Sequence, residues 1–86
     1  MAKKKVKKVL KYTAIFEPAE EGGYVVHVPS LPGCHTQGET FEEAVEMVKD
    51  AISGYLYVLK KHGEEIPRES EETVISKVEV PQPVAV

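Results

Sequence analysis

Few side chains in this chain are of types that perform chemistry. The only cysteine, Cys34, stands beside His35, and the other two histidines are His27 and His62. Thiolate and imidazole bind zinc, but structural zinc sites use paired spacings of the CxxC or HxxxH kind, which this sequence lacks. We therefore predict no metal site. Cys34 is expected to be a small buried side chain, and His27 a residue on the face of a strand.

Nucleophiles and acid–base pairs are equally scarce. Ser30 has no histidine and carboxylate at a recognisable spacing, and the glycines match neither a phosphate-binding loop nor a dinucleotide fingerprint. Asp50 is the only aspartate. Hydrolysis by two metal ions needs several acidic side chains that converge, and the strand carboxylates for such a site are missing. We therefore predict that the protein is not an enzyme, needs no cofactor and acts by binding.

The charges divide the chain into two parts. Six of the eleven basic residues lie in the first eleven positions, whereas from Tyr12 onward fourteen acidic side chains outnumber five basic ones, a net charge of −9. A negative body repels phosphate backbones and attracts basic partners. For the basic arm, residues 1–8, two roles stay open: a solvated leader that keeps a strand edge soluble, or a segment that touches nucleic acid.

Length and composition indicate one small domain. The 86 residues are 42% apolar, enough for a thin core, so burial against a second copy is a reasonable expectation. A single cysteine excludes an internal disulfide, which suits a reducing compartment. No signal peptide and no apolar run of membrane-spanning length is visible. These features predict a cytoplasmic protein without a membrane segment.

Alternation of apolar and polar side chains predicts the strands. They fall at residues 9–17, 24–28, 34–38 and 73–80. A crossover helix would deliver the last strand beside the first, with the right-handed connection as the default. The predicted class is therefore α+β: a single antiparallel or mixed sheet of about four strands with one long helix on one face, in the order β-β-β-α-β.

The helix has clear boundary signals. Thr40 and Glu43 have the spacing of a capping box, and Gly63 is the expected stop after about 22 residues. Its apolar stripe is wider than a single sheet needs, because three residues extend it around one side: Met47, Ala51 and Val58. We predict that they form either the edge of the core or an interface between copies of the chain.

A proline-rich corner separates the second and third strands. Its two prolines fix φ and bar a central-strand ladder, and Leu31 between them is predicted to plug the underside of the turn. The corner is also a rigid, partly apolar patch. We predict a partner-binding surface made of five residues: Pro29, Leu31, Pro32, Gly33 and His35. The alternative is a corner that serves only as a turn and a core plug.

The predicted domain covers residues 9–80, followed by a short tail at 81–86. Within it, residues 28–44 read VPxLPGCxTxGxTxEEA and follow GGYVV at residues 22–26. Over about residues 10–65, the chain resembles the HicB-like antitoxin family. The resemblance implies a degenerate, partial RNase H-like fold, and an antitoxin of a type II pair. Too few residues follow the last strand for a separate DNA-binding domain, so we do not expect direct DNA binding.

The resemblance also implies a partner and a mechanism. The toxin of such a pair, HicA, is a small basic RNA-cleaving protein, and the antitoxin silences it by occlusion. Members commonly form homodimers or higher homo-oligomers. Two alternatives remain open: a stand-alone oligomeric module that binds another protein or a ligand, and a residual metal-dependent nuclease.

Overall fold

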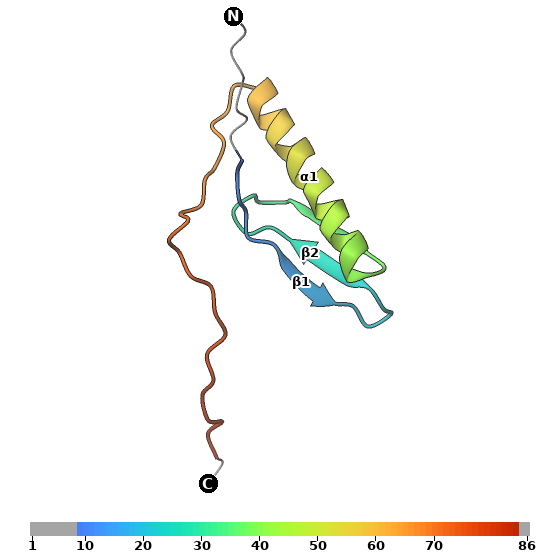
Figure 1. The fold of residues 1–86 in the computed structure, drawn as a ribbon, viewed down its shortest axis with the longest axis vertical. Coiled ribbons are helices and arrows are strands. Elements are labelled where there is room, and N and C mark those ends of the chain that lie inside the picture. Colours follow the sequence, from blue (N-terminus) through green and yellow to red (C-terminus); the bar gives the residue numbers. More distant parts are fainter. Residues whose placement is uncertain (1–8, 85–86) are drawn as a thin grey trace, which may run out of the picture.

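The computed structural model describes residues 9–84, so the predicted basic arm at residues 1–8 lies outside the described residues. Three short strands precede one long helix: β1 (Ile15–Pro18), β2 (Tyr24–His27), β3 (His35–Gly38) and α1 (Phe41–Lys61). The strands form an antiparallel sheet in the order β1-β2-β3, and α1 lies across one of its faces (Figure 1). The predicted α+β class is confirmed, with three strands in place of about four.

Glycine makes the turn between β1 and β2 possible. Gly22 and Gly23 have φ values of 102° and 76°, in the left-handed region that favours glycine. The Gly22 N–H donates to the Ala19 carbonyl (3.1 Å) and the Ala19 N–H donates to the Gly23 carbonyl (3.0 Å). A side chain on Gly23 would collide with the carbonyl oxygen of Gly38. The turn therefore packs tightly against the end of β3.

The predicted helix boundaries are confirmed. The Glu43 N–H donates to the Thr40 hydroxyl (3.0 Å), which satisfies one of the free donors of the first turn. The Glu43 carboxylate accepts from the N–H of Glu39, one residue before the position that a capping box uses. Gly63 follows α1 with φ 72°. The helix is therefore held at both ends by local contacts.

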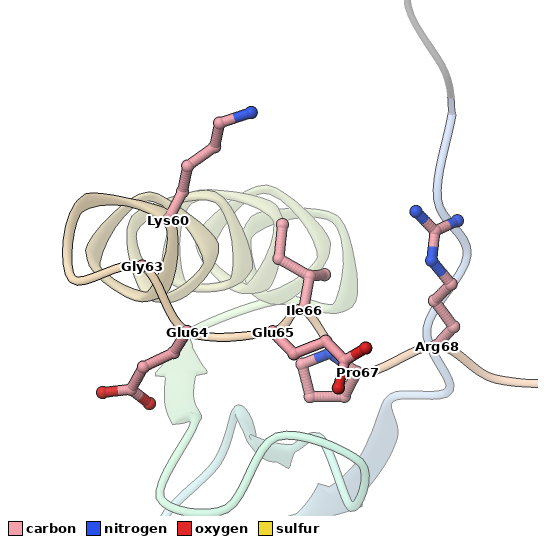
Figure 2. Close-up of a pocket in the computed structure, with 7 residues that line it drawn as sticks. All are labelled: Lys60, Gly63, Glu64, Glu65, Ile66, Pro67 and Arg68. Carbon is pink, nitrogen blue, oxygen red and sulfur yellow. The ribbon is translucent and has the colours of Figure 1, made fainter.

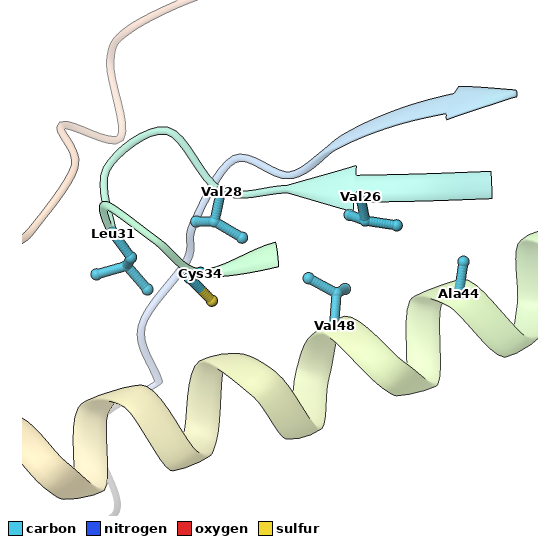
Figure 3. Close-up of a cluster of buried hydrophobic side chains, with 6 residues drawn as sticks. All are labelled: Val26, Val28, Leu31, Cys34, Ala44 and Val48. Atoms are coloured by element: carbon cyan, nitrogen blue, oxygen red, sulfur yellow. The ribbon is translucent and has the colours of Figure 1, made fainter. Parts of the chain in front are cut away.

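The core lies between the sheet and the helix. Strand register places Phe16, Val26 and Thr36 in one row on the face that α1 covers. Six hydrophobic side chains are buried, and Figure 3 shows them converging from the sheet, the corner and the helix: Val26, Val28, Leu31, Cys34, Ala44 and Val48. Leu31 and Cys34 occupy the buried positions that the sequence predicts. Burial raises the pKa of the Cys34 thiol, which keeps it neutral.

Two strand predictions are wrong, one in its extent and one in its existence. The first strand begins at Ile15 and not at residue 9, and residues 73–80 are not a strand. Strands need a paired neighbour, and a turn at residues 70–73 leads the chain away from the sheet, with the Thr73 N–H directed to the Ser70 carbonyl (3.4 Å). Beyond that turn the chain is extended and exposed (Figure 1).

The exposed part, residues 70–84, is called the C-terminal segment below. It gives the molecule a radius of gyration of 17.5 Å, whereas a compact chain of this length has about 12 Å. The compact body therefore ends at Glu69.

Candidate functional site

The corner between β2 and β3 is built from two consecutive turns that share Leu31. The Leu31 N–H donates to the Val28 carbonyl (3.0 Å), and the Cys34 N–H donates to the Leu31 carbonyl (2.9 Å). A third bond closes the corner, from the Val28 N–H to the Cys34 carbonyl (3.0 Å). Leu31 is 0% exposed beneath these turns. The corner is therefore fixed by its own backbone and by a buried plug, as the sequence predicts.

The predicted partner-binding residues fall into two groups. Pro29, Pro32, Gly33 and His35 are exposed, whereas Leu31 is fully buried and supports them from below. The Tyr55 hydroxyl donates to the Pro32 carbonyl (2.8 Å) and so ties the corner to α1. Three of the exposed residues thus lie within the hydrogen-bonded corner, and His35 lies at the beginning of β3 directly after it.

A carboxylate that sequence reasoning missed fastens this corner to the rest of the body. Glu69 accepts hydrogen bonds from the Thr13 N–H (2.9 Å), the Thr13 hydroxyl (2.8 Å) and the Ser30 hydroxyl (2.7 Å). These bonds, that from the Thr13 backbone foremost, lower the pKa of Glu69. We call this arrangement the Glu69 clasp. It joins segments that are 39 and 56 residues apart in the chain.

A second contact lies beside the clasp. The Tyr12 hydroxyl donates to the Pro67 carbonyl, and burial raises the pKa of Tyr12, so the hydroxyl stays protonated. Just before it, residues 63–68 form a shallow hollow of about 690 Å³ at the end of α1. Figure 2 shows Ile66 directed toward the helix, while Lys60 and Glu64 point away from each other. The hollow offers no converging groups for chemistry.

Among residues 9–84, no helix or strand covers the face of the sheet opposite α1. Strand register sets Ile15, His27 and His35 in one row on this face, and Val25 in the next row. Side chains directly opposite on antiparallel strands have Cβ atoms about 4.5–5.5 Å apart. Ile15 and Val25 are 38% and 41% exposed. The predicted position of His27 on a strand face is confirmed, and the open face continues into the corner through His35.

Several carboxylates lie at the end of the body where α1 begins. The turn between β1 and β2 and the start of α1 lie together there (Figure 1). Glu21, Glu39 and Glu43 line one hollow of about 420 Å³, together with the apolar side chains of Tyr24 and Met47. We call this region the acidic end. Four more glutamates lie in the adjoining end of β1, the same turn and the first helical turns: Glu17, Glu20, Glu42 and Glu46.

The helix has two apolar flanks on either side of its buried face. Met47, Ala51 and Val58 form one flank, with Met47 and Val58 43% and 49% exposed. The other flank, which includes Ile52 and Leu56, borders a groove beside residues 10–14. The structure therefore brings the three predicted interface residues together on one flank.

Residues 9–84 have neither a metal-binding cluster nor a membrane-spanning helix. No group of three or more histidine, cysteine or acidic side chains comes together there as a metal site would require. Asp50 lies exposed on α1, and Glu17 lies on the opposite face of the sheet. Over the same residues, no helix combines the length and the apolar character needed to cross a bilayer.

Comparison with known proteins decides the family. A sequence model described as "HicB_like antitoxin of bacterial toxin-antitoxin system" matches residues 12–83, which is most of the chain. The chain belongs to the HicB-like antitoxin family. The resemblance found in the motif from Val28 to Ala44 is thereby confirmed, and membership supports an antitoxin role with a toxin as partner in general.

Relatives of this HicB-like chain are of two lengths. It is 52% identical over 65 residues to UPF0150 protein Ta0767 of Thermoplasma acidophilum, covering 76% of this chain and 94% of the relative. It is 43% identical over 60 residues to Antitoxin HicB 1 of Photorhabdus laumondii, covering 70% of this chain and 39% of that protein. With Antitoxin HicB of Escherichia coli K12 the identity is 46% over 43 residues, covering 50% of this chain and 31% of the relative. The chain thus spans about a third of the two named antitoxins.

Contacts between the end of β3 and the start of α1 explain three residues of the HicB-like motif: Gly38, Thr40 and Ala44. A Cβ on Gly38 would lie 2.7 Å from the Cα of Ala44, so a glycine and a small residue are needed where β3 meets the start of α1. Thr40 between them caps the helix. Sequence reasoning assigned Gly38 only to the end of a strand. The close approach to Ala44 has no signal in a single sequence other than the two small residues themselves.

Proposed function

We propose that this protein neutralises a small basic RNA-cleaving toxin of the HicA type by binding and occluding it. The observation that carries the proposal is the acidic end, where Glu21, Glu39 and Glu43 share a hollow with Tyr24 and Met47. A protein that holds RNA must present positive charge where it contacts phosphates. Carboxylates around apolar side chains complement such a surface in charge.

The corner and the open sheet face would extend this contact. Pro29, Pro32 and Gly33 lie in a corner that three backbone hydrogen bonds, a buried leucine and Tyr55 hold in place, and His35 follows at the beginning of β3. A rigid surface loses little conformational freedom on binding, so more of the contact energy appears as affinity. The mechanism is obstruction: the antitoxin covers the groups with which the toxin holds RNA, and performs no reaction itself.

The remaining expectations belong to the same proposal. The protein acts in the cytoplasm without a cofactor and forms a homodimer or a higher homo-oligomer. Met47, Ala51 and Val58 contribute to a contact between copies, because this partly exposed apolar flank of α1 is wider than the core requires. The likeness to a partial RNase H fold stays a prediction.

Binding to a purified HicA-like toxin tests the proposal. Calorimetric titration should give a tight complex whose affinity falls with rising salt, because exposed charges carry part of the encounter. Charge reversal by Glu21→Lys together with Glu39→Lys should weaken binding by about tenfold or more. The matched control is Glu64→Lys together with Glu65→Lys, two exposed glutamates near the opposite end of α1, which should change affinity less than about threefold.

Growth assays complete the test. Co-expression with the toxin should restore growth, and the complex should co-purify. Failure of the wild-type chain to bind any such toxin would reject the proposed function. Equal weakening by the two double variants would place the contact elsewhere on the body.

A second candidate is a stand-alone oligomeric module that binds another protein or a ligand. It is favoured by two relatives of which this chain covers 94%, because both are named UPF0150 proteins and not antitoxins. A gene neighbourhood without a small basic reading frame would support this candidate, whereas an adjacent frame of that kind would argue against it.

A further inference from the structure

The C-terminal segment has the pattern of a strand and lacks the neighbours of one. Val74, Ser76, Val78 and Val80 alternate with Ile75, Lys77 and Glu79, as on the two faces of a strand. Yet Val74 and Val78 are 85% and 80% exposed in the single chain. Side chains of this kind are stabilised by about 1.5–3 kcal/mol each when fully buried. A segment with this alternation has apolar side chains for one face of a strand, but in the single chain it has no neighbouring strand and no core that would bury them.

The segment is directed away from its own sheet. The Glu69 clasp holds the chain beside Thr13, next to the beginning of β1. The turn at residues 70–73 then redirects it, with the Glu72 N–H donating to the Ser70 hydroxyl (3.1 Å). Figure 1 shows the segment running past the sheet and on beyond the body. The C-terminal segment therefore begins near β1, but its apolar residues at 73–80 lie away from the sheet.

The body of the protein has a free strand edge and an apolar groove beside it. β1 pairs with β2 on one side only, so its outer edge has unpaired backbone groups among the described residues. Beside it lies a groove of about 650 Å³ between residues 10–14 and α1. The groove is mostly apolar, and its lining includes Leu10, Tyr12, Ala14, Val45, Ile52 and Leu56.

We propose that residues 73–80 of one copy add to the outer edge of β1 in a second copy and cover this groove. A strand in that position directs every other side chain toward α1, so Val74, Val78 and Val80 would enter the groove while Lys77 and Glu79 face water. Lys11 and Lys49 line the same groove, and Glu71 and Glu72 flank the incoming strand, so the charges also match.

A second copy is the occupant that these features select. Each copy carries both the donor strand and the acceptor edge, so a two-fold axis satisfies both at once. The contact uses the flank of α1 opposite Met47, Ala51 and Val58, and leaves that flank and the acidic end uncovered. The inference does not depend on the toxin: the exchange is a property of the antitoxin alone.

Sedimentation of the full chain over a range of concentrations tests the exchange. The wild type should associate reversibly, and Val78→Asp should weaken association by about tenfold or more, because a carboxylate would enter the apolar groove. Lys77→Asp is the matched control on the opposite face of the same strand, with an expected change below about threefold. Both residues are exposed in the single chain, so neither substitution should change the thermal unfolding temperature of the full-length monomer at low concentration.

Cross-linking distinguishes exchange from a strand folded back on its own chain. Two differently tagged copies, both with Cys34→Ala, carry Glu17→Cys and Lys77→Cys respectively. Both positions would face water on neighbouring strands, so a disulfide should join the two tags. Glu46→Cys in place of Glu17→Cys, on the outer side of α1, should give none. A monomer at all concentrations, or a disulfide formed within a single chain that carries both cysteines, would overturn the proposal. Association that is unchanged by Val78→Asp would also overturn the proposal. So would a disulfide between copies that forms only when toxin is added.

Discussion

The corner with β3 and the C-terminal segment have opposite outcomes, although both were predicted to contribute a strand. Both contain two prolines beside β-branched or apolar residues, which alternate strictly only in the segment. In the corner, Leu31 is 0% exposed and the backbone bonds close within seven residues. In the segment, Val74 is 85% exposed and no strand forms. Alternation therefore creates the capacity to be a strand, but a neighbour with a free edge decides whether one forms.

The largest expected difference between the two regions is in core truncation. Leu31→Ala should lower the free energy of unfolding by about 2–5 kcal/mol, because it removes a buried plug and leaves a cavity under two turns. Val74→Ala should change it by less than about 0.5 kcal/mol in the monomer, because its side chain is already in water. Urea unfolding at low protein concentration measures both. Equal losses would show that the segment belongs to the folded body.

A steric change at the junction of β3 and α1 comes next. Gly38→Ala should cost about 1–3 kcal/mol, because its Cβ would lie 2.7 Å from the Cα of Ala44 and the helix would have to shift. Gly54→Ala is the matched control on an exposed position of α1, where a Cβ meets no atom within 4 Å and stability should rise slightly. Thermal unfolding of both variants compares them, and a neutral Gly38→Ala would contradict the close packing.

The Glu69 clasp marks the boundary between the two regions, and its loss should cost about 1–2 kcal/mol. Glu69→Gln removes the charge that strengthens three hydrogen bonds. Because folding lowers the pKa of Glu69, its stabilisation is fully present above the unfolded pKa of about 4.3 and is lost as pH falls through the folded value. The stability difference between wild type and Glu69→Gln should therefore be constant near neutral pH and shrink in acid. A difference that grows in acid would contradict the assignment.

The smallest effect is expected at the helix cap. Thr40→Ala should cost about 1 kcal/mol, because the Glu43 N–H loses its acceptor in the first turn. Thr40→Ser keeps the hydroxyl and should be near neutral. Loss of stability in both variants would mean that the methyl group, and not the cap, is what matters at this position.

Local signals made most of the body predictable. The capping residues, Gly63 and the apolar stripe gave α1 almost to its ends, and the prolines gave the corner with Leu31 beneath it. Contacts between distant parts of the chain had no such signal. Glu69 looked like one more glutamate in a charged link, although it bonds to Thr13 and Ser30. The last strand was predicted because alternation reports which faces a strand would have, and not which edge it meets.

The acidic end was only partly predictable. The net charge of the body follows from composition alone, but the approach of Glu21 to Glu39 and Glu43 depends on the packing of the hairpin turn against the end of β3. That packing rests on Gly23, whose contact with Gly38 no periodicity reveals. The corner residues Pro29, Pro32, Gly33 and His35 stay a predicted partner surface, now with a defined shape.

Amide hydrogen exchange of the full chain, alone and with a purified HicA-like toxin, tests the central claim most directly. The account predicts that the toxin slows exchange at the acidic end, in residues 19–24 and 37–43, and around the corner at residues 28–35. Protection of residues 73–80 should instead depend on protein concentration and be present without toxin. Unchanged exchange at the acidic end and corner in a saturated complex would contradict the account.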